Sequence, residues 1–227
     1  MLYIVGGVYI VLITTKKIKH AWRTLEFYGL IIYGPQGIGK TTYMLKVMYE
    51  IYRDWDKVFQ YLVFSFDDLI DVMRQARERR IKVIGWDDAG IHGHKYMYFF
   101  EKQAVMLISA WIDVVRTRIA GWLITTPNPS SLIKPVRESP GFNYGKVMYT
   151  HGSGTSRLVK VYAKHWYPGG RIIARKLYYD YFHARLPDDV YKEYMEMRER
   201  FYEEAERNLL KNIELKEKQF RSSPPTE

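Results

Sequence analysis

The sequence predicts an α/β fold in which a parallel β-sheet is flanked by helices and is followed by a small β-meander and a long C-terminal helix. Over residues 16–145, short apolar runs alternate with amphipathic segments, which is the pattern of parallel strands joined by helices. Over residues 146–186, strand-like runs follow one another across Gly-rich turns. The length of 227 residues fits one domain with an appendage, and 47% hydrophobic with 26% charged residues is a globular composition.

The chain contains no cysteine. This excludes a disulfide-stapled secreted fold, a thiolate zinc site and a cysteine nucleophile. The formal net charge of +10 points instead to an anionic partner, which the charge alone does not identify as nucleic acid, nucleotide or lipid headgroup.

Residues 1–15 form an apolar N-terminal arm. Residues 2–13 are uncharged and are followed by Lys16, Lys17 and Lys19. As a helix this run would reach about 18 Å, against a hydrocarbon core of roughly 30 Å, so it is too short to span a membrane. Its β-branched residues favour a strand-like arm, and peripheral membrane attachment is the alternative. Because the charges follow the apolar run, unlike those of a signal peptide, we expect a cytoplasmic protein.

The core, residues 16–145, alternates between the two types of element. Runs of apolar residues predict strands, and apolar residues at three-and-four spacing predict helices. The predicted strands are 28–33, 61–66, 81–86 and 121–126, and the predicted helices are 16–24, 40–52, 69–79 and 97–115. Asp67 and Asp68 precede the third helix and are expected to cap it.

The loop between the first predicted strand and the next helix carries the strongest motif. It reads Gly34-Pro35-Gln36-Gly37-Ile38-Gly39-Lys40-Thr41 and is followed by Thr42, matching the phosphate-loop pattern G-x-x-x-x-G-K-[ST]. The glycines let backbone N–H groups surround a phosphate, Lys40 neutralises the outer phosphates, and the Thr41 hydroxyl can ligate Mg²⁺. The sequence therefore predicts a P-loop protein that binds a nucleoside triphosphate with Mg²⁺. ATP is the expected nucleotide, and the motif leaves GTP open as the alternative.

Two acids end the predicted strand 81–86. Their position at the carboxyl edge of the sheet predicts that Asp87 holds the metal and that Asp88 acts as general base toward the attacking water. With a complete strand, 61–66, between the loop and these acids, the layout resembles the additional-strand class of P-loop ATPases. That class usually has glutamate at the second position, so the shorter Asp88 predicts slow turnover.

A second polar strand end, Thr125-Thr126, reaches the same edge. Either hydroxyl is a candidate to orient the lytic water, and capping of the following Pro-Asn-Pro turn is the alternative. Arg116, Arg118 and Arg137 surround this strand and are candidates for an arginine supplied to the γ-phosphate of a neighbouring subunit.

The positive charge is concentrated after the core. Residues 121–186 contain ten basic and two acidic residues, a net charge of +8. In the predicted strand 157–166, Lys160, Tyr162, Lys164 and Trp166 share one face, which would suit DNA backbone contacts and base stacking. The alternative is an edge strand that uses lysines against aggregation. Residues 187–220 predict one long amphipathic helix, and residues 221–227 a disordered tail.

The motifs together resemble the DnaA-like P-loop ATPases of crenarchaeal fuselloviruses and related plasmids. The resemblance is carried by residues 34–45 (GPQGIGKTTYML), 87–91 (DDAGI), 125–129 (TTPNP), 136–138 (VRE) and 186–194 (LPDDVYKEY). It implies an AAA+-like ATPase of a mobile element that oligomerises and acts on DNA in genome replication or maintenance. In contrast to the helical lid of such proteins, the segment after the core is predicted to form strands.

Two alternative functions use the same nucleotide site. The first is a DNA packaging or transfer translocase, which the sequence does not separate from a replication protein. The second is a nucleotide-gated membrane or scaffold tether, in which the apolar arm docks on lipid or on a partner and ATP switches assembly with little turnover.

Overall fold

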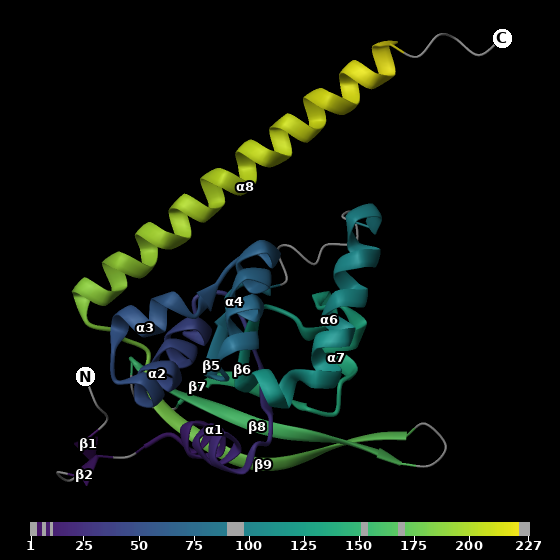
Figure 1. The fold of residues 1–227 in the computed structure, drawn as a ribbon. Helices are drawn as coiled ribbons and strands as arrows, with labels where there is room; N and C mark the ends of the chain where they lie inside the picture. Colours follow the sequence, from purple (N-terminus) through teal and green to yellow (C-terminus); the bar gives the residue numbers. More distant parts are fainter. Residues whose placement is uncertain are drawn as a thin grey trace. The chain divides into compact units, whose positions relative to one another are not determined.

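The computed structural model describes residues 4–5, 8–9, 11–89, 98–150, 154–167 and 171–222. The chain divides into two compact units, residues 1–186 and 187–227. The larger unit contains a seven-stranded sheet and its covering helices, and the smaller unit contains one helix (Figure 1).

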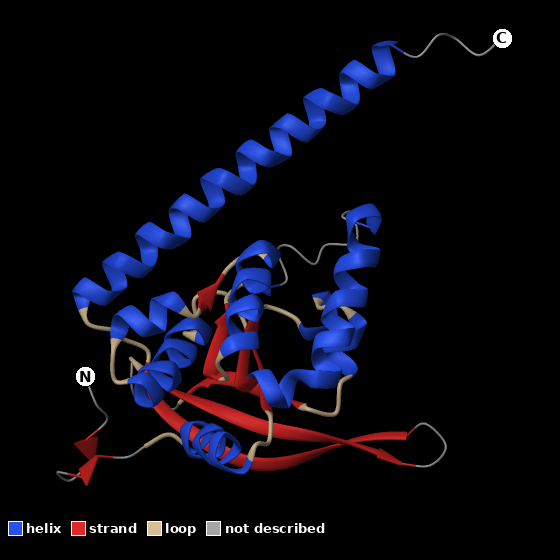
Figure 2. Cartoon of the chain, in the orientation of Figure 1, coloured by secondary structure: helices blue, strands red, loops and turns tan. Residues whose placement is uncertain are grey.

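The sheet of the larger unit, whose strands are red in Figure 2, is mixed. Its strand order is β4-β5-β6-β3-β7-β8-β9. Its strands are β3 (Tyr28–Tyr33), β4 (Leu62–Val63), β5 (Ile81–Trp86), β6 (Ile119–Thr126), β7 (Phe142–Tyr149), β8 (Ser156–Tyr167) and β9 (Arg171–His183). The first five in spatial order are parallel, and β6 lies between β3 and β5. The strand that ends in Thr125-Thr126 therefore separates the phosphate-loop strand from the strand that ends in Asp87.

The expectation of a parallel sheet followed by a meander needs correction. β7 begins at Phe142, pairs in parallel with β3, and is thus a fifth strand of the core. β8 and β9 then pair antiparallel and continue the same sheet. The physical reason is the register of β7, which places the buried Phe142 beside Gly29 and in contact with Trp122 in the core.

Helices cover both faces of the parallel part of the sheet (Figure 1). On one face lie α1 (Ile13–Thr24) and α2 (Lys40–Tyr52). The approach of α2 is close, since a Cβ on Gly85 would lie 2.6 Å from Met48 Sδ. The neighbouring Ile84 points to the other face, into a hydrophobic cluster with residues of α4 (Phe66–Glu78), α6 (Tyr98–Arg118) and α7 (Lys134–Glu138).

Most predicted core elements agree with the structure, and β3, α2 and β5 agree residue by residue. The strand predicted at 61–66 contains only Leu62–Val63, because Ser65 caps α4 and the helix begins at Phe66. Ser65 accepts a hydrogen bond from the Asp68 N–H, and the Asp68 carboxylate accepts one from the Ser65 N–H. The cap predicted for Asp67 and Asp68 is therefore centred on Ser65. The short helices α3 (Trp55–Gln60) and α7 were not predicted.

Helix α1 begins at Ile13, inside the predicted arm of residues 1–15. Its first N–H groups are capped by distant carboxylates: Glu50 accepts from Leu12 N, and Asp180 accepts from Ile13 N and Thr14 N. Since these acceptors lie on α2 and β9, a local pattern could not indicate this start. In the arm itself, β1 (Ile4–Val5) and β2 (Val8–Tyr9) pair antiparallel, and the remaining arm residues before Val11 lie outside the described residues.

The smaller unit contains α8 (Asp188–Ser222), a single helix of 35 residues. It extends two residues into the predicted tail, and residues 223–227 lie outside the described part. None of the helices in the described ranges combines the length and the apolarity that a bilayer crossing requires.

Candidate functional site

The glycine-rich loop leaves the carboxyl end of β3 and leads directly into α2. Gly34, Gly37 and Gly39 have φ angles of 149°, 72° and 99°, which residues other than glycine rarely adopt. Gly39 is the N-cap of α2 and offers no side-chain acceptor to the first N–H groups of the helix. The N-terminus of α2 can therefore bind an anion through its backbone N–H groups. The loop residues beside it, Pro35, Gln36 and Gly37, are exposed to solvent.

Lys40, the first residue of α2, folds back over the loop. Its ammonium donates to the carbonyl oxygens of Gly34, at 3.1 Å, and Pro35, at 2.9 Å. The side chain is 7% exposed. Lys40 thus holds a positive charge at the mouth of the loop, where phosphate oxygens could take the place of the two carbonyls.

Asp87 follows β5 and is 1% exposed. Its Oδ1 accepts hydrogen bonds from Thr41 Oγ1, at 2.8 Å, and from Thr125 Oγ1, at 2.6 Å. The structure therefore brings together the two residues that the sequence predicted as Mg²⁺ ligands. A hydroxyl and a carboxylate oxygen are the hard ligands that Mg²⁺ takes when substrate phosphates complete its shell, so these residues fit that ion.

Asp88 lies beside Asp87 in a strained backbone conformation, with φ 46°. Its N–H donates to Thr125 Oγ1 at 2.8 Å, and the residue is half-buried. The Thr125 hydroxyl, buried on β6, thus bonds to both acids. The sequence offered the hydroxyl of Thr125 or Thr126 as a candidate to orient the lytic water, with turn capping as the alternative. In the structure the Thr125 hydroxyl bonds to Asp87 and Asp88, and its role toward water stays a prediction.

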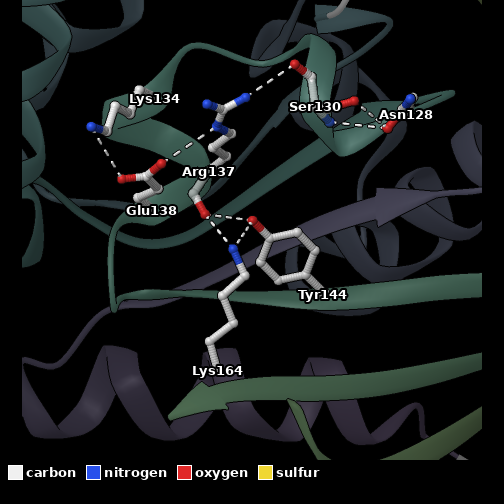
Figure 3. A network of polar contacts seen from close by, with 7 residues as sticks. All are labelled: Asn128, Ser130, Lys134, Arg137, Glu138, Tyr144 and Lys164. Carbon is white, nitrogen blue, oxygen red and sulfur yellow. Dashed lines mark hydrogen bonds and ion pairs between the residues drawn. The ribbon is translucent and has the colours of Figure 1, made fainter. Parts of the chain in front are cut away.

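Thr126 and Arg137 lie at either end of a second network, at the turn after β6. Figure 3 shows the part of this network around Arg137. Thr126 Oγ1 bonds to Asn128 O and Ser131 Oγ, which is the turn-capping role weighed against catalysis. The Arg137 guanidinium donates to Ser130 O at 3.2 Å and lies 3.7 Å from the Glu138 carboxylate. Within this structure both residues hold the β6–β7 connection, and a role of Arg137 toward a neighbouring subunit stays a prediction.

Arg116 and Arg118 lie in the last turn of α6, before β6 begins. Because β6 runs parallel to β3 and pairs Thr126 with Tyr33, these arginines are at the sheet edge opposite the phosphate loop. The length of β6 separates them from the loop by roughly 20 Å. They cannot reach the phosphates of their own chain, and their role toward a neighbour stays a prediction.

The four residues predicted to contact DNA are placed differently from one another. Lys160 lies with its ammonium 5.2 Å from the Tyr162 ring centre. Lys164 instead donates to the Arg137 carbonyl at 2.8 Å and to the Tyr144 hydroxyl (Figure 3), and burial lowers its pKa. Trp166 belongs to β8, but its side chain lies outside the described residues. Lys164 is therefore committed to a contact within the protein.

A contribution of β9 to the site was not predicted. A Cβ on Gly39 would lie 3.1 Å from the Ala184 Cβ, just past the end of β9, and 3.6 Å from the Phe182 ring. Further along β9, the buried Asp180 accepts a hydrogen bond from Tyr43 of α2. The last strand of the sheet thus packs against the phosphate loop and its helix, and the sequence contains no local signal of this contact.

No model of a known protein family matches the chain. The chain is 34% identical over 206 residues to the uncharacterized protein B-251 of Sulfolobus spindle-shape virus 1, covering 83% of this chain and 80% of that protein. It is 27% identical over 182 residues to the uncharacterized protein ORF286 of Acidianus two-tailed virus, covering 78% of this chain and 60% of ORF286.

Among solved structures, the KaiC-like protein PH0186 from Pyrococcus horikoshii OT3 aligns with 66% of this chain and 91% of its own, at a TM-score of 0.34 and 13% identity. The match to B-251 is much more extensive in sequence. With a third of the aligned residues identical over four fifths of both proteins, the chain belongs to a family of archaeal virus proteins that includes B-251 of Sulfolobus spindle-shape virus 1.

Proposed function

We propose that this viral protein is a Mg²⁺-dependent P-loop ATPase that hydrolyses the γ-phosphate bond. The observation that carries the proposal is the contact between Thr41 and Asp87 beside the glycine-rich loop and Lys40. A nucleotide site of this kind needs a loop for the phosphates, a cation, and two hard oxygen ligands at one place. Here these groups come from the loop after β3, the first turn of α2 and the end of β5.

Each residue has a distinct role in this proposal. The loop backbone from Gly34 to Gly39 binds phosphate oxygens, and Lys40 exchanges its loop carbonyls for them. Thr41 and Asp87 hold Mg²⁺, which when bound offsets the negative charge of the phosphates. Asp88 accepts the proton of the attacking water, and Thr125 holds both acids in position.

We do not propose that this ATPase is a DnaA-like AAA+ protein. An AAA+ protein carries a helical lid after its core, whereas the described residues between β7 and Leu186 form the strands β8 and β9. The strand order, with β6 between β3 and β5, supports the additional-strand ATPase class more directly.

The test is Mg²⁺-dependent phosphate release from ATP and, in parallel, from GTP. We expect Lys40→Ala to lower release to the background level. Asp88→Asn should lower turnover by about a hundredfold or more, because a general base contributes that much, while nucleotide affinity is retained. Lys17→Ala removes an exposed lysine of α1 and is the matched control, expected to keep wild-type activity. Release that is absent from the wild type, or equal in Lys40→Ala, would contradict the proposal.

A further inference from the structure

One face of the sheet changes character where the antiparallel strands begin. Across the parallel strands this face is covered by α4, α6 and α7, and Tyr144 of β7 packs against their cluster. Beyond β7 the same face continues through the cross-strand pairs Lys146–Lys160, Tyr162–Lys176 and Lys160–Tyr179. We call this the lysine–tyrosine face; it comprises Lys146, Lys160, Tyr162, Lys176, Tyr179 and Tyr181.

Three side chains of the lysine–tyrosine face are exposed, and the other three, Lys160, Tyr162 and Tyr179, are half-buried. Lys146 and Lys176 are exposed, and Tyr181 is 55% exposed. The Lys160 ammonium lies 5.2 Å from the Tyr162 ring centre and 5.9 Å from that of Tyr179, and the Lys176 ammonium lies 5.0 Å from the Tyr179 ring centre. Hydrogen bonding to Tyr162 raises the pKa of Lys160, so this lysine stays charged.

The positive charge of this face has no acidic counterpart nearby in the sequence. Asp180 is the only acid among residues 142–186. It is buried against α1 and α2, where Ile13 N, Thr14 N and Tyr43 donate to it. Lys146 and Lys160, directly opposite each other, form a like-charge pair that is unfavourable in the isolated protein and that an anion would relieve.

The position of β8 within the sheet argues against the alternative explanation for its lysines, which is that they protect a sheet edge against aggregation. Lysines that protect a sheet from aggregation lie on an edge strand. β8 is paired on both sides, with β7 and with β9. Protection of an edge therefore does not account for Lys160, nor does it account for Lys146 on the interior strand β7.

We propose that the lysine–tyrosine face binds single-stranded nucleic acid, with Lys146, Lys160 and Lys176 contacting phosphates and Tyr179 and Tyr181 stacking on bases. Lysines beside the exposed Tyr181 and the half-buried Tyr179 offer both contacts that a single strand makes with a protein. A duplex would engage the lysines alone, since its bases are stacked inside the helix. The observations behind this proposal are independent of those that support the proposed ATPase activity, and its test needs no nucleotide.

The test is the fluorescence anisotropy of a labelled oligothymidylate of about 20 nucleotides, longer than one typical site, titrated with the full chain at several salt concentrations. We expect Lys160→Ala combined with Lys176→Ala to weaken binding. The slope of log affinity against log salt should become shallower by about 1.4, because each phosphate contact on a single strand contributes about 0.7. Tyr181→Ala should weaken binding by roughly five- to hundredfold, with Tyr181→Phe close to wild type.

The matched control removes the same charge elsewhere. Lys16→Ala combined with Lys17→Ala deletes two exposed lysines of α1, which packs on the opposite face of the sheet. This double variant should retain the salt slope of the wild type. Equal losses in the two double variants, or no binding by the wild type at low salt, would overturn the proposal. A duplex of the same length that binds as tightly as the single strand would also overturn it, as would binding only to anionic lipid vesicles.

Discussion

Asp87 receives two hydroxyl hydrogen bonds on a single carboxylate oxygen, one from Thr41 and one from Thr125. Thr41 lies in the first turn of α2, after the phosphate loop, and Thr125 lies on β6, the strand between β3 and β5. The Thr125 hydroxyl also accepts the N–H of Asp88, whose backbone is in the left-handed region. One buried hydroxyl thus fixes the orientation of the proposed metal ligand and the conformation of the candidate base.

We predict that Thr125→Val separates catalysis from nucleotide binding. Valine has a similar shape but leaves the Asp88 N–H without this acceptor and Asp87 without one donor, so the free energy of unfolding should fall by about 1–3 kcal/mol. Turnover should fall by about ten- to a hundredfold, as is usual for residues that orient metal ligands, with a much smaller change in nucleotide affinity. Steady-state kinetics and urea unfolding measure the two effects.

Thr125→Ser is the control for this prediction, because serine keeps the hydroxyl and loses only a methyl group. It should recover most of the turnover. If Thr125→Ser and Thr125→Val lose activity equally, the hydroxyl does not position the acids, and packing at β6 explains the effect.

The sequence predicted part of this site because part of it is local. Lys40 and Thr41 lie in one continuous motif, and Asp87 follows an apolar strand, so spacing and strand polarity were enough to predict that they lie at one edge of the sheet. The bond between Thr125 and Asp88 joins residues 37 positions apart and depends on β6 lying beside β5. A single sequence does not determine which neighbouring strand end its hydroxyl will meet.

At the level of elements, α1, α2, β3 and β9 are joined by a buried cluster of hydroxyl groups. Thr14 bonds to Tyr43 and to Tyr178, Tyr178 bonds to Tyr28, and Tyr43 donates to Asp180. Burial raises the pKa of Tyr28, Tyr43 and Tyr178 well above the ordinary value for tyrosine. All three are therefore neutral in the folded protein at any moderate pH.

This cluster predicts a loss of stability in alkali. In the unfolded chain these tyrosines ionise near pH 10, whereas in the folded protein they remain protonated. Their contribution is fully present below about pH 10 and declines as the pH rises further, because the unfolded state then releases protons that the folded state keeps. Each tyrosine should lower the free energy of unfolding by about 1.4 kcal/mol per pH unit in that range.

Urea unfolding between about pH 9 and pH 11 measures this slope. Tyr178→Phe removes one of the buried hydroxyls and should give a shallower dependence, although its stability at neutral pH also falls. Tyr191→Phe, at an exposed position of α8, should leave the slope unchanged. An unaltered slope in Tyr178→Phe would show that this hydroxyl does not carry the alkaline dependence.

The elements that sequence periodicity missed are short or are defined by distant contacts. α3 and α7 contain 6 and 5 residues, too few for a repeating apolar pattern. β4 is shorter than its apolar run because the capping box of Ser65 and Asp68 starts a helix there. In each of these cases a local cap or a tertiary contact outweighed the propensity of the run.

At the scale of the larger unit, one continuous sheet connects the proposed nucleotide site to the lysine–tyrosine face. Tyr33 ends β3 immediately before the phosphate loop and lies edge-on to Tyr144, with ring centres 6.3 Å apart. Burial raises the pKa of Tyr33, and the nearby Tyr162 adds to this effect. Because β3 pairs Tyr33 with Lys146 of the lysine–tyrosine face, the proposed nucleic-acid surface begins beside the start of the loop proposed to bind phosphate.

The sequence predicted the α/β class and the order of the strands and helices along the chain in the parallel part, since alternating strands and helices permit few arrangements. It did not predict that β7, β8 and β9 extend the same sheet. Strand-like runs joined by Gly-rich turns are compatible with a separate meander or with a continued sheet. The pairing of β7 with β3 decides between them, and it depends on how Phe142 packs beside Gly29.

The most direct test of the central claim is equilibrium dialysis of labelled ATP against the full chain, with Mg²⁺ and with EDTA. We expect one nucleotide per chain and an affinity at least about tenfold higher with Mg²⁺, a difference of about 1.4 kcal/mol. Asp87→Asn should abolish that difference. Absence of ATP binding by the wild type, or equal affinity with and without Mg²⁺, would show that the glycine-rich loop, Thr41 and Asp87 do not form a Mg²⁺-dependent ATP site.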